Sequence, residues 1–149
     1  MSRTEIVTFT NMCMVRDGNR VVVQNRIDPG WPGIVLPGGH VEEGESFTAA
    51  VIREVFEETG LTIEAPRLCG VKDWYDENGR YVVLLYQADR FSGELRSSSE
   101  GEVFWADLGE LPRMKLAGSM AETLRVFLED DLSELQYFPG DGAWTCAFR

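Results

Sequence analysis

Glu54, Glu57 and Glu58 have the residue type and the spacing of a site for a divalent cation. In a helix that turns by about 100° per residue, these three carboxylates share about a third of the circumference. Their repulsion is unfavourable, since the i,i+4 pair of Glu54 and Glu58 alone costs about 0.2 to 0.5 kcal/mol. A hard cation such as Mg²⁺ or Mn²⁺ would reverse this effect, because such ions prefer oxygen ligands. A solvated acidic helix face is the alternative interpretation.

The helix that positions these glutamates is predicted to span residues 47–59. Ser46 can cap its first turn, and Gly60 can end it in a left-handed conformation. Apolar residues occupy much of the remaining circumference, so we expect the helix to be largely buried, which fits a solvated acidic face poorly. These apolar residues are Phe47, Ala50, Val51, Ile52, Val55 and Phe56. The glycines of the preceding turn, at positions 38 and 39, allow the backbone to approach a ligand closely.

The spacing of glycine, glutamate and arginine across this stretch resembles the Nudix box, the motif of the Nudix hydrolase family. The matching residues are Gly39, Glu45, Arg53, Glu54, Val55, Glu57, Glu58, Gly60 and Leu61. The resemblance implies an α/β/α sandwich with a mixed β-sheet between helices, and hydrolysis of a nucleoside diphosphate linked to another group. It also implies that the three glutamates hold catalytic Mg²⁺, or Mn²⁺ as a substitute, with the carbonyl of Gly38 as a further ligand. Gly39, Glu45, Arg53 and Gly60 would support the loop and the helix.

Hydrolysis also needs a carboxylate that accepts a proton from the attacking water. The resemblance places this base among the box glutamates or in a later loop, where Glu100 and Glu102 are the candidates. We favour Glu100, which precedes a predicted strand, although either residue could be an ordinary solvated glutamate. Arg53 is expected to have a structural role, either pairing with Glu45 or helping to hold the helix carboxylates. His40, the only histidine, lies beside the glycine turn, where it could contact a phosphate or be an ordinary loop residue.

Four aromatic side chains are candidates for stacking on a nucleobase, which contributes about 1 to 3 kcal/mol per ring. They are Trp31, Trp74, Tyr75 and Phe104, of which we expect one or two to stack and the others to pack in the core.

The resemblance favours a MutT-type enzyme that hydrolyses a nucleoside triphosphate, including the group that acts on 8-oxo-dGTP. The chain is short, and the segments PGGHVE and GES fit that group. Hydrolysis of ADP-ribose or a nucleotide sugar stays open, although Asp76 stands where ADP-ribose hydrolases tend to have proline. A nucleotide-sensing domain without turnover is the alternative from another class, and the intact box weighs against it.

The composition predicts a single domain over residues 1–149, with 44% hydrophobic and 26% charged residues. The net charge of −11 argues against binding to DNA or RNA polymers, but not against a small phosphorylated ligand. We expect a cytoplasmic protein without membrane association, since no apolar run has transmembrane length and the first residues do not resemble a signal peptide. Three widely spaced cysteines, Cys13, Cys69 and Cys146, predict free thiols rather than a disulfide framework or a zinc site.

The rest of the chain is predicted to form strands and one further helix around the box. The predicted strands span 4–15, 20–26, 34–36, 61–64, 68–75, 81–86 and 102–106, with loops at 91–94 and 97–101. Asp76-Glu77-Asn78-Gly79 predicts a hairpin turn. An apolar stripe predicts a second helix over 117–130. The tail, 134–149, is predicted to form a small hairpin on the body or on a partner subunit, so a homodimer is compatible with the sequence.

Overall fold

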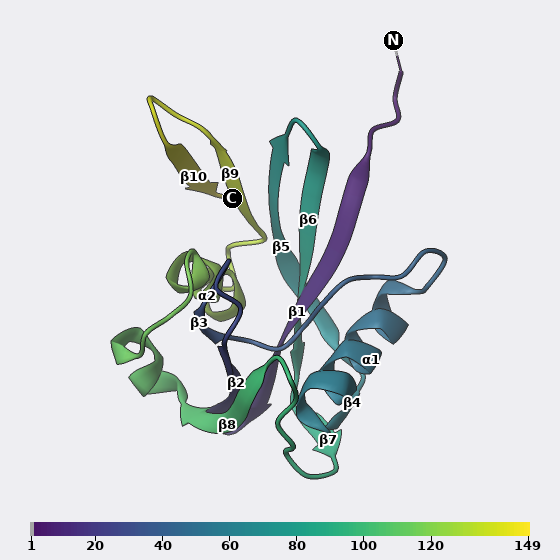
Figure 1. The fold of residues 1–149 in the computed structure, drawn as a ribbon, viewed down its shortest axis with the longest axis vertical. Coiled ribbons are helices and arrows are strands. Elements are labelled where there is room, and N and C mark those ends of the chain that lie inside the picture. Colours follow the sequence, from purple (N-terminus) through teal and green to yellow (C-terminus); the bar gives the residue numbers. More distant parts are fainter. Residues whose placement is uncertain (1) are drawn as a thin grey trace.

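A mixed β-sheet forms the centre of the computed structural model, which describes residues 2–149 (Figure 1). Its strand order is β10-β9-β5-β6-β1-β2-β3, and β8 also pairs with β2. The strands are β1 Val7–Asp17, β2 Arg20–Arg26, β3 Gly33–Val35, β5 Arg67–Asp76, β6 Gly79–Ala88, β8 Gly101–Asp107, β9 Glu134–Pro139 and β10 Trp144–Phe148. The pairs β1–β6 and β5–β9 are parallel, whereas β5–β6 and β1–β2 are antiparallel. The mixed sheet is confirmed.

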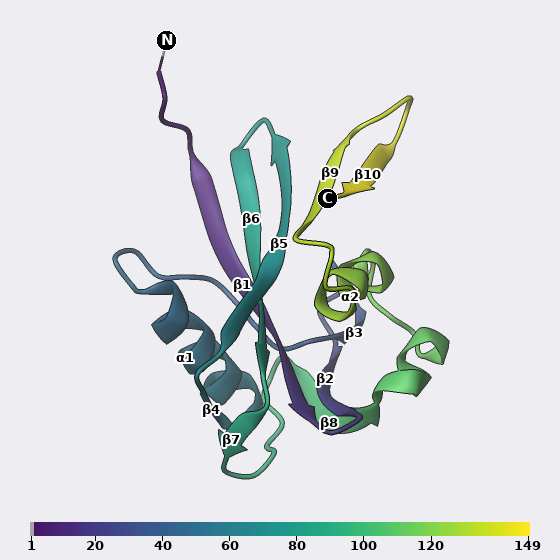
Figure 2. The same ribbon diagram turned by 180° about the vertical axis from the view of Figure 1, so that it is seen from behind.

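Strand β1 joins the two halves of this sheet. Residues 7–15 pair with β6, and only the last two residues, Arg16 and Asp17, pair with β2. The strands β10, β9, β5 and β6 therefore form one half, and β2, β3 and β8 form the other. The two halves diverge from β1 in Figure 1, and Figure 2 shows the same divergence from behind.

Two helices lie on opposite sides of the first half, α1 (Phe47–Thr59) and α2 (Met120–Leu128) (Figures 1 and 2). Side chains of β1 alternate between them, as a period of two requires. Met12 and Met14 belong to the core cluster that contains α2, whereas Cys13 and Val15 belong to the cluster beneath α1. The predicted layering of helix, sheet and helix is confirmed.

The predicted bounds of α1 are confirmed because local caps define both ends. The Ser46 hydroxyl accepts a hydrogen bond from the Ala49 amide, and Gly60 adopts a left-handed φ of 80°. The expectation that the helix is largely buried is wrong at its two phenylalanines, Phe47 and Phe56, which are exposed. A helix lying on a sheet buries only one stripe, and here that stripe holds Ala50, Val51 and Val55.

Several other elements differ from the prediction. Residues 90–92 form a strand, β7 (Arg90–Ser92), which pairs with β4 (Thr62–Glu64) where a loop was predicted. This pairing is a tertiary contact that the local sequence does not signal. Helix α2 is shorter than predicted, because Ser119 has a positive φ of 66° and the helix starts after it. A short 3-10 helix, η1 (Leu108–Arg113), was not predicted.

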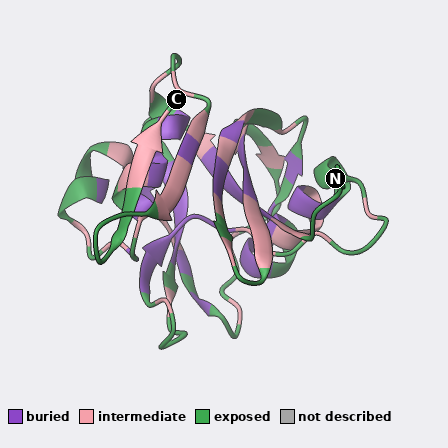
Figure 3. Cartoon of the chain, turned by 90° about the horizontal axis from the view of Figure 1, so that it is seen from above, coloured by how far each residue is buried: buried purple, intermediate pink, exposed green. Residues whose placement is uncertain are grey.

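The C-terminal hairpin of β9 and β10 is confirmed, and it extends the edge of the sheet next to β5. Figure 3 shows that buried positions follow the inner strands and the helix faces that touch them, whereas turns and the N-terminal segment are exposed. All three cysteines are free, as predicted; Cys13 is buried and the other two are half-buried. Within residues 2–149, no helix has the length and apolar character needed to cross a membrane.

Candidate active site

A cleft of about 830 Å³ is lined by residues from both halves of the sheet and from α1. Its lining contains two groups of residues with different chemistry. We call the first group the acidic part, which consists of Gly38, Gly39, Glu54, Glu58 and Glu100. We call the second group the aromatic part, which consists of Trp31, Lys72, Trp74, Tyr81, Ser119, Tyr137 and Trp144.

The glycine turn packs tightly between β1 and α1. A Cβ atom at Gly38 would lie 2.1 Å from the Asn11 carbonyl oxygen, and one at Gly39 would lie 2.3 Å from the Glu54 carboxyl carbon. The Gly38 amide donates to Glu58 Oε2 at 3.2 Å, and the Gly39 amide donates to Asn11 Oδ1 at 3.1 Å. Only glycine fits at position 38, because any side chain would overlap with the backbone of β1, whereas a side chain at position 39 would displace the Glu54 carboxylate.

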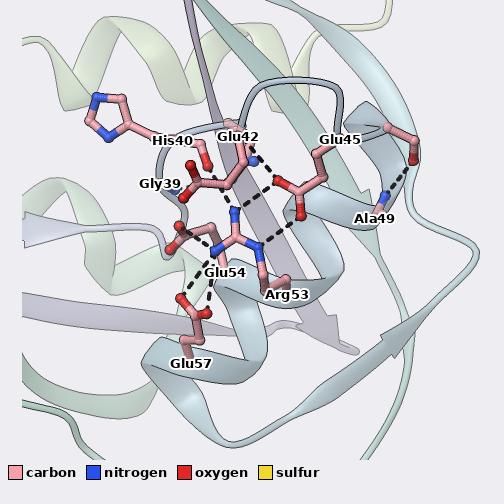
Figure 4. Close-up of polar contacts among 10 residues, drawn as sticks. Gly39, His40, Glu42, Glu45, Ala49, Arg53, Glu54 and Glu57 are labelled. Carbon is pink, nitrogen blue, oxygen red and sulfur yellow. Dashed lines mark hydrogen bonds and ion pairs between the residues drawn. The ribbon is translucent and has the colours of Figure 1, made fainter.

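Arg53 connects the loop to the helix glutamates (Figure 4). Its guanidinium donates to both carboxylate oxygens of Glu45, at 2.8 and 2.9 Å, which is one of the two roles that the sequence predicted. It also donates to Glu54 Oε1 at 3.0 Å, to Glu57 Oε2 at 3.2 Å and to the His40 carbonyl at 3.0 Å. The bonds from Arg53 to Glu45, together with a bond from the Glu42 amide, hold the pKa of Glu45 down to about 2. The arrangement fixes the loop relative to the helix.

Glu58 is the most buried carboxylate of the cleft, with 5% of its surface exposed. Burial raises its pKa to about 9, with the neighbouring Glu100 as a further cause and the Gly38 amide opposing the shift. Burial also raises the pKa of Glu54. A divalent cation bound by these carboxylates would favour their ionised forms. It would thereby offset the cost of burying the carboxylates and the repulsion between them.

The three box glutamates do not all face the cleft. Glu54 and Glu58 line it, whereas Glu57 is exposed, lies outside the lining and is bound by Arg53. Within the part of the chain that the structure describes, residues 2–149, no group of three His, Cys, Asp or Glu side chains is arranged to hold a metal ion. The donor set nevertheless fits Mg²⁺ or Mn²⁺ in its chemistry, because its side chains are carboxylates and the buried Glu58 lies beside Glu54 and Glu100.

The two candidate bases of the later loop occupy different places. Glu100 lines the cleft beside Glu58, and its amide donates to Ser98 Oγ at 3.2 Å. Glu102 is exposed on β8 and does not line the cleft. Of these two residues, therefore, only Glu100 is placed to accept a proton from a water in the acidic part. His40 lines the cleft, and in Figure 4 its imidazole points away from the Arg53 network.

Two of the four aromatic candidates line the cleft, Trp31 and Trp74. Trp74 stacks on Tyr81 with ring centroids 4.4 Å apart and an angle of 11° between the planes. Tyr75 is 56% exposed and does not line the cleft, because neighbouring residues of a strand point to opposite faces. Phe104 packs against the core instead. Trp31 and Trp74 are therefore the two of the four that could contact a ligand in the cleft, and stacking on a base stays a prediction.

Sequence reasoning missed Lys72, Tyr81, Ser119, Tyr137 and Trp144, all of which line the cleft. A signal existed for Lys72, since it lies two residues before Trp74 on the same predicted strand and must share its face. No such signal existed for Tyr137 and Trp144, because they reach the cleft from the C-terminal hairpin through pairing of β9 with β5.

Comparison with known proteins agrees with this geometry. Residues 8–127 match the family model of the NUDIX domain. The uncharacterized Nudix hydrolase YvcI of Bacillus subtilis is 32% identical over 120 residues, which cover 76% of this chain and 74% of YvcI. An ADP-ribose pyrophosphatase of Methanocaldococcus jannaschii is 32% identical over 102 residues, which cover 66% of this chain and 60% of that protein.

A solved structure has nearly the same extent as this chain. The crystal structure of a MutT protein from Bacillus halodurans superimposes with a TM-score of 0.76 at 27% sequence identity, covering 93% of this chain and 97% of the MutT chain. The family match covers most of the chain and includes the box, the glycine turn, β1 from its second residue and every strand from β2 to β8. The chain belongs to the Nudix hydrolase family, whose members act on pyrophosphate bonds.

Proposed function

We propose that this protein is a divalent-metal-dependent pyrophosphohydrolase that cleaves a nucleoside triphosphate to the monophosphate and pyrophosphate. The observation that carries the proposal is the joint lining of one cleft by buried carboxylates and by aromatic rings. Carboxylates suit a cation that binds phosphate oxygens, and aromatic planes suit a base. A nucleotide is the ligand that offers both groups at once.

The residues of the acidic part have separate tasks in this proposal. Glu54 and Glu58, which line the cleft, and the Gly38 carbonyl would hold Mg²⁺ or Mn²⁺. Glu57 would join them once it is released from Arg53. When bound, the cation supplies Lewis acidity towards the phosphoryl oxygens. Glu100 accepts the proton of the attacking water, because it lines the cleft next to Glu58. Arg53 keeps Glu54 and the Glu45 loop in position through its hydrogen bonds. The glycine turn lets α1 and its carboxylates pack closely against β1.

An oxidised purine nucleotide such as 8-oxo-dGTP is the substrate that we favour. Support comes from the MutT protein of Bacillus halodurans, whose structure covers almost the whole of both chains. ADP-ribose is the second candidate, because the relative from Methanocaldococcus jannaschii is an ADP-ribose pyrophosphatase. The net charge of −11 favours small nucleotides over DNA or RNA polymers. A single domain, a cytoplasmic location and a homodimer stay predictions from the sequence.

The proposal is tested by measuring pyrophosphate and phosphate release with Mg²⁺ from a panel of substrates. The panel contains 8-oxo-dGTP, the ordinary nucleoside triphosphates, ADP-ribose, nucleotide sugars and a diadenosine polyphosphate. Glu57→Gln and a metal-free sample serve as negative controls. Glu64→Gln serves as the matched control, because Glu64 is an exposed glutamate of β4 and pairs only loosely with Arg90, at 3.9 Å.

We expect pyrophosphate from 8-oxo-dGTP, lost in Glu57→Gln and without metal and retained in Glu64→Gln. If ADP-ribose were turned over faster than every triphosphate, ADP-ribose would replace 8-oxo-dGTP as the proposed substrate. Nucleotide binding without any turnover would contradict the enzymatic proposal and indicate a nucleotide-sensing domain.

A further inference from the structure

Lys72 is a buried cation inside the cleft that the hydrolytic chemistry does not use. It lies on β5, is 7% exposed and belongs to the aromatic part rather than to the acidic part. Lysine is almost never this buried without a partner. Its ammonium donates a hydrogen bond to Ser119 Oγ, which leaves two further N–H groups.

Aromatic rings, not carboxylates, surround this ammonium. The Lys72 nitrogen lies 5.8 Å from the ring centroid of Trp31 and 5.6 Å from those of Trp74 and Tyr137. Within residues 2–149, no carboxylate lies within the 4.0 Å that an ion pair requires, and the more distant Glu122 acts only as a background charge. Burial lowers the pKa of Lys72 to about 8, so the side chain is still mostly cationic at neutral pH.

The chemistry of these neighbours indicates which ligand group can reach Lys72. The faces of aromatic rings carry negative potential, which attracts the ammonium and disfavours an anion between the same rings. A phosphate is therefore a poor ligand here, and the acidic part already provides for phosphates. A neutral carbonyl oxygen is a good ligand, because it accepts a hydrogen bond without adding a full negative charge.

Further polar groups of the cleft lack protein partners. Within the described residues 2–149, neither amide atom of Gln24 has a hydrogen-bond partner, nor does Asn11 Nδ2, and both side chains are buried. Buried polar groups are normally satisfied, so these amides indicate that the cleft takes a ligand with several hydrogen-bonding atoms. A nucleobase has such an edge, and Trp74 lines the same cleft.

We propose that Lys72 donates a hydrogen bond to a carbonyl oxygen of the substrate's base, so that the cleft selects keto bases over amino bases. This inference rests on the proposed function, since it names the class of base that the same cleft accepts. A 6-keto purine or a 4-keto pyrimidine presents an acceptor to the ammonium. Adenine and cytosine present an amino group at that position, and their N–H donors would face the donors of Lys72 and leave both unpaired.

The size of the selection follows from the cost of unpaired buried groups. A site built to hydrogen-bond one substrate group rejects an analogue that lacks it far more strongly than a purely apolar pocket does. We expect kcat/KM for the keto substrate to exceed that for the amino substrate by at least about tenfold. Most of the difference should appear in KM, because the base lies away from the acidic part.

The test uses two pairs of nucleotides, dITP with dATP and UTP with CTP, which differ in the keto or amino group and in whether the adjacent ring nitrogen carries a proton. The variant is Lys72→Met, which keeps an unbranched apolar side chain and removes the ammonium. The matched control is Lys115→Met, because Lys115 is the only other lysine and its side chain is exposed. Ser119→Ala is a second variant that removes only the hydroxyl that holds the ammonium. Thermal unfolding of each variant verifies that it is folded.

We expect the wild type and Lys115→Met to prefer both keto substrates, Lys72→Met to lose the preference, and Ser119→Ala to reduce it. The proposal is overturned if Lys72→Met keeps the wild-type preference, or if the wild type prefers dATP and CTP. Binding of dIMP and dAMP, followed by tryptophan fluorescence, separates this proposal from the hydrolytic one. A preference for dIMP that requires Lys72 supports it even without turnover, whereas equal binding or no binding of the two overturns it.

Discussion

The acidic and aromatic parts of the cleft are assembled in different ways. Most of the acidic part comes from one stretch, because the glycine turn and α1 lie within residues 38–60 and only Glu100 is remote. The aromatic part takes its side chains from the β2–β3 loop, β5, β6, the residue before α2, β9 and β10. The chemistry is thus encoded locally, whereas the recognition of the ligand depends on how distant strands pair.

This contrast predicts that variants of the two parts affect different kinetic constants. The largest effect is expected for Glu58→Gln in the acidic part. We expect kcat to fall by on the order of 10³, because one buried carboxylate is lost from both metal binding and charge balance. KM should change little, since the aromatic part is intact. Steady-state kinetics with saturating Mg²⁺ measure both constants.

Glu58→Gln is expected to fold, because the amide oxygen still accepts from Gly38 and an amide is neutral in a site that disfavours charge. A thermal unfolding curve is the control. Wild-type kcat in a folded Glu58→Gln protein would show that the acidic part is not the place of hydrolysis.

A smaller loss is expected from Arg53→Lys. Lysine keeps the positive charge but cannot make the two parallel bonds to Glu45 while also reaching Glu54. Because a small displacement of a catalytic group such as Glu54 slows the reaction strongly, kcat should fall by about 10- to 100-fold. Arg113→Lys is the control, since Arg113 is an exposed arginine paired with Glu110. If Arg53→Lys and Arg113→Lys had the same kcat, Arg53 would not position the catalytic groups.

In the aromatic part, Trp74→Leu should act on KM. Loss of a stacking plane costs about 1 to 3 kcal/mol, which corresponds to a KM about 5- to 150-fold higher at nearly constant kcat. Tyr75→Leu is the matched control, because Tyr75 is the next residue of β5 and does not line the cleft. If the Tyr75 variant raised KM as much as the Trp74 variant, the two faces of β5 would have been assigned wrongly.

The smallest effect on activity is expected at Asp73, a buried side chain that follows Lys72 in β5 and does not line the cleft. Burial raises its pKa to about 6, with Glu134 as a further cause and Arg80 opposing the shift. The folded state therefore binds more protons than the unfolded state between the ordinary value of 3.8 and about 6. This contribution to stability is present at low pH and is lost as the pH rises through about 6.

Asp73→Asn should therefore be more stable than the wild type at pH 7.5 by about 2 to 3 kcal/mol, which is the free-energy equivalent of the pKa shift, and most of this gain should disappear at pH 4. Urea unfolding at the two pH values measures the difference. The base preference should not change, because Asp73 faces away from the cleft. A gain that is the same at both pH values would argue against the titration of Asp73 as its cause.

The same contrast explains how much the sequence could predict. The bounds of α1 were predicted to the residue because Ser46 and Gly60 define its ends locally. The Asp76–Gly79 turn and the C-terminal hairpin were also found from short-range signals. The box supplied the candidate residues of the acidic part, but the placement of Glu57 outside the cleft depends on Arg53 and could not be deduced from helical angles alone.

The aromatic part could be predicted only in fragments. Trp31 and Trp74 were named as residue types able to stack, without knowledge of the face that each occupies. Tyr75 was an equal candidate until the pairing of β5 with β6 defined its direction. Tyr137 and Trp144 needed the parallel pairing of β9 with β5, a contact between segments about 60 residues apart in the sequence, for which no local pattern exists.

The central claim is that one cleft combines two independently acting parts, and a double-mutant cycle tests it most directly. Mg²⁺-dependent pyrophosphate release from 8-oxo-dGTP is measured for the wild type, Glu58→Gln, Trp74→Leu and the double variant. We predict turnover by the wild type, and losses in kcat/KM whose free energies add within about 0.5 kcal/mol. Absence of metal-dependent release by the wild type, or a double variant no worse than Glu58→Gln alone, would contradict the account.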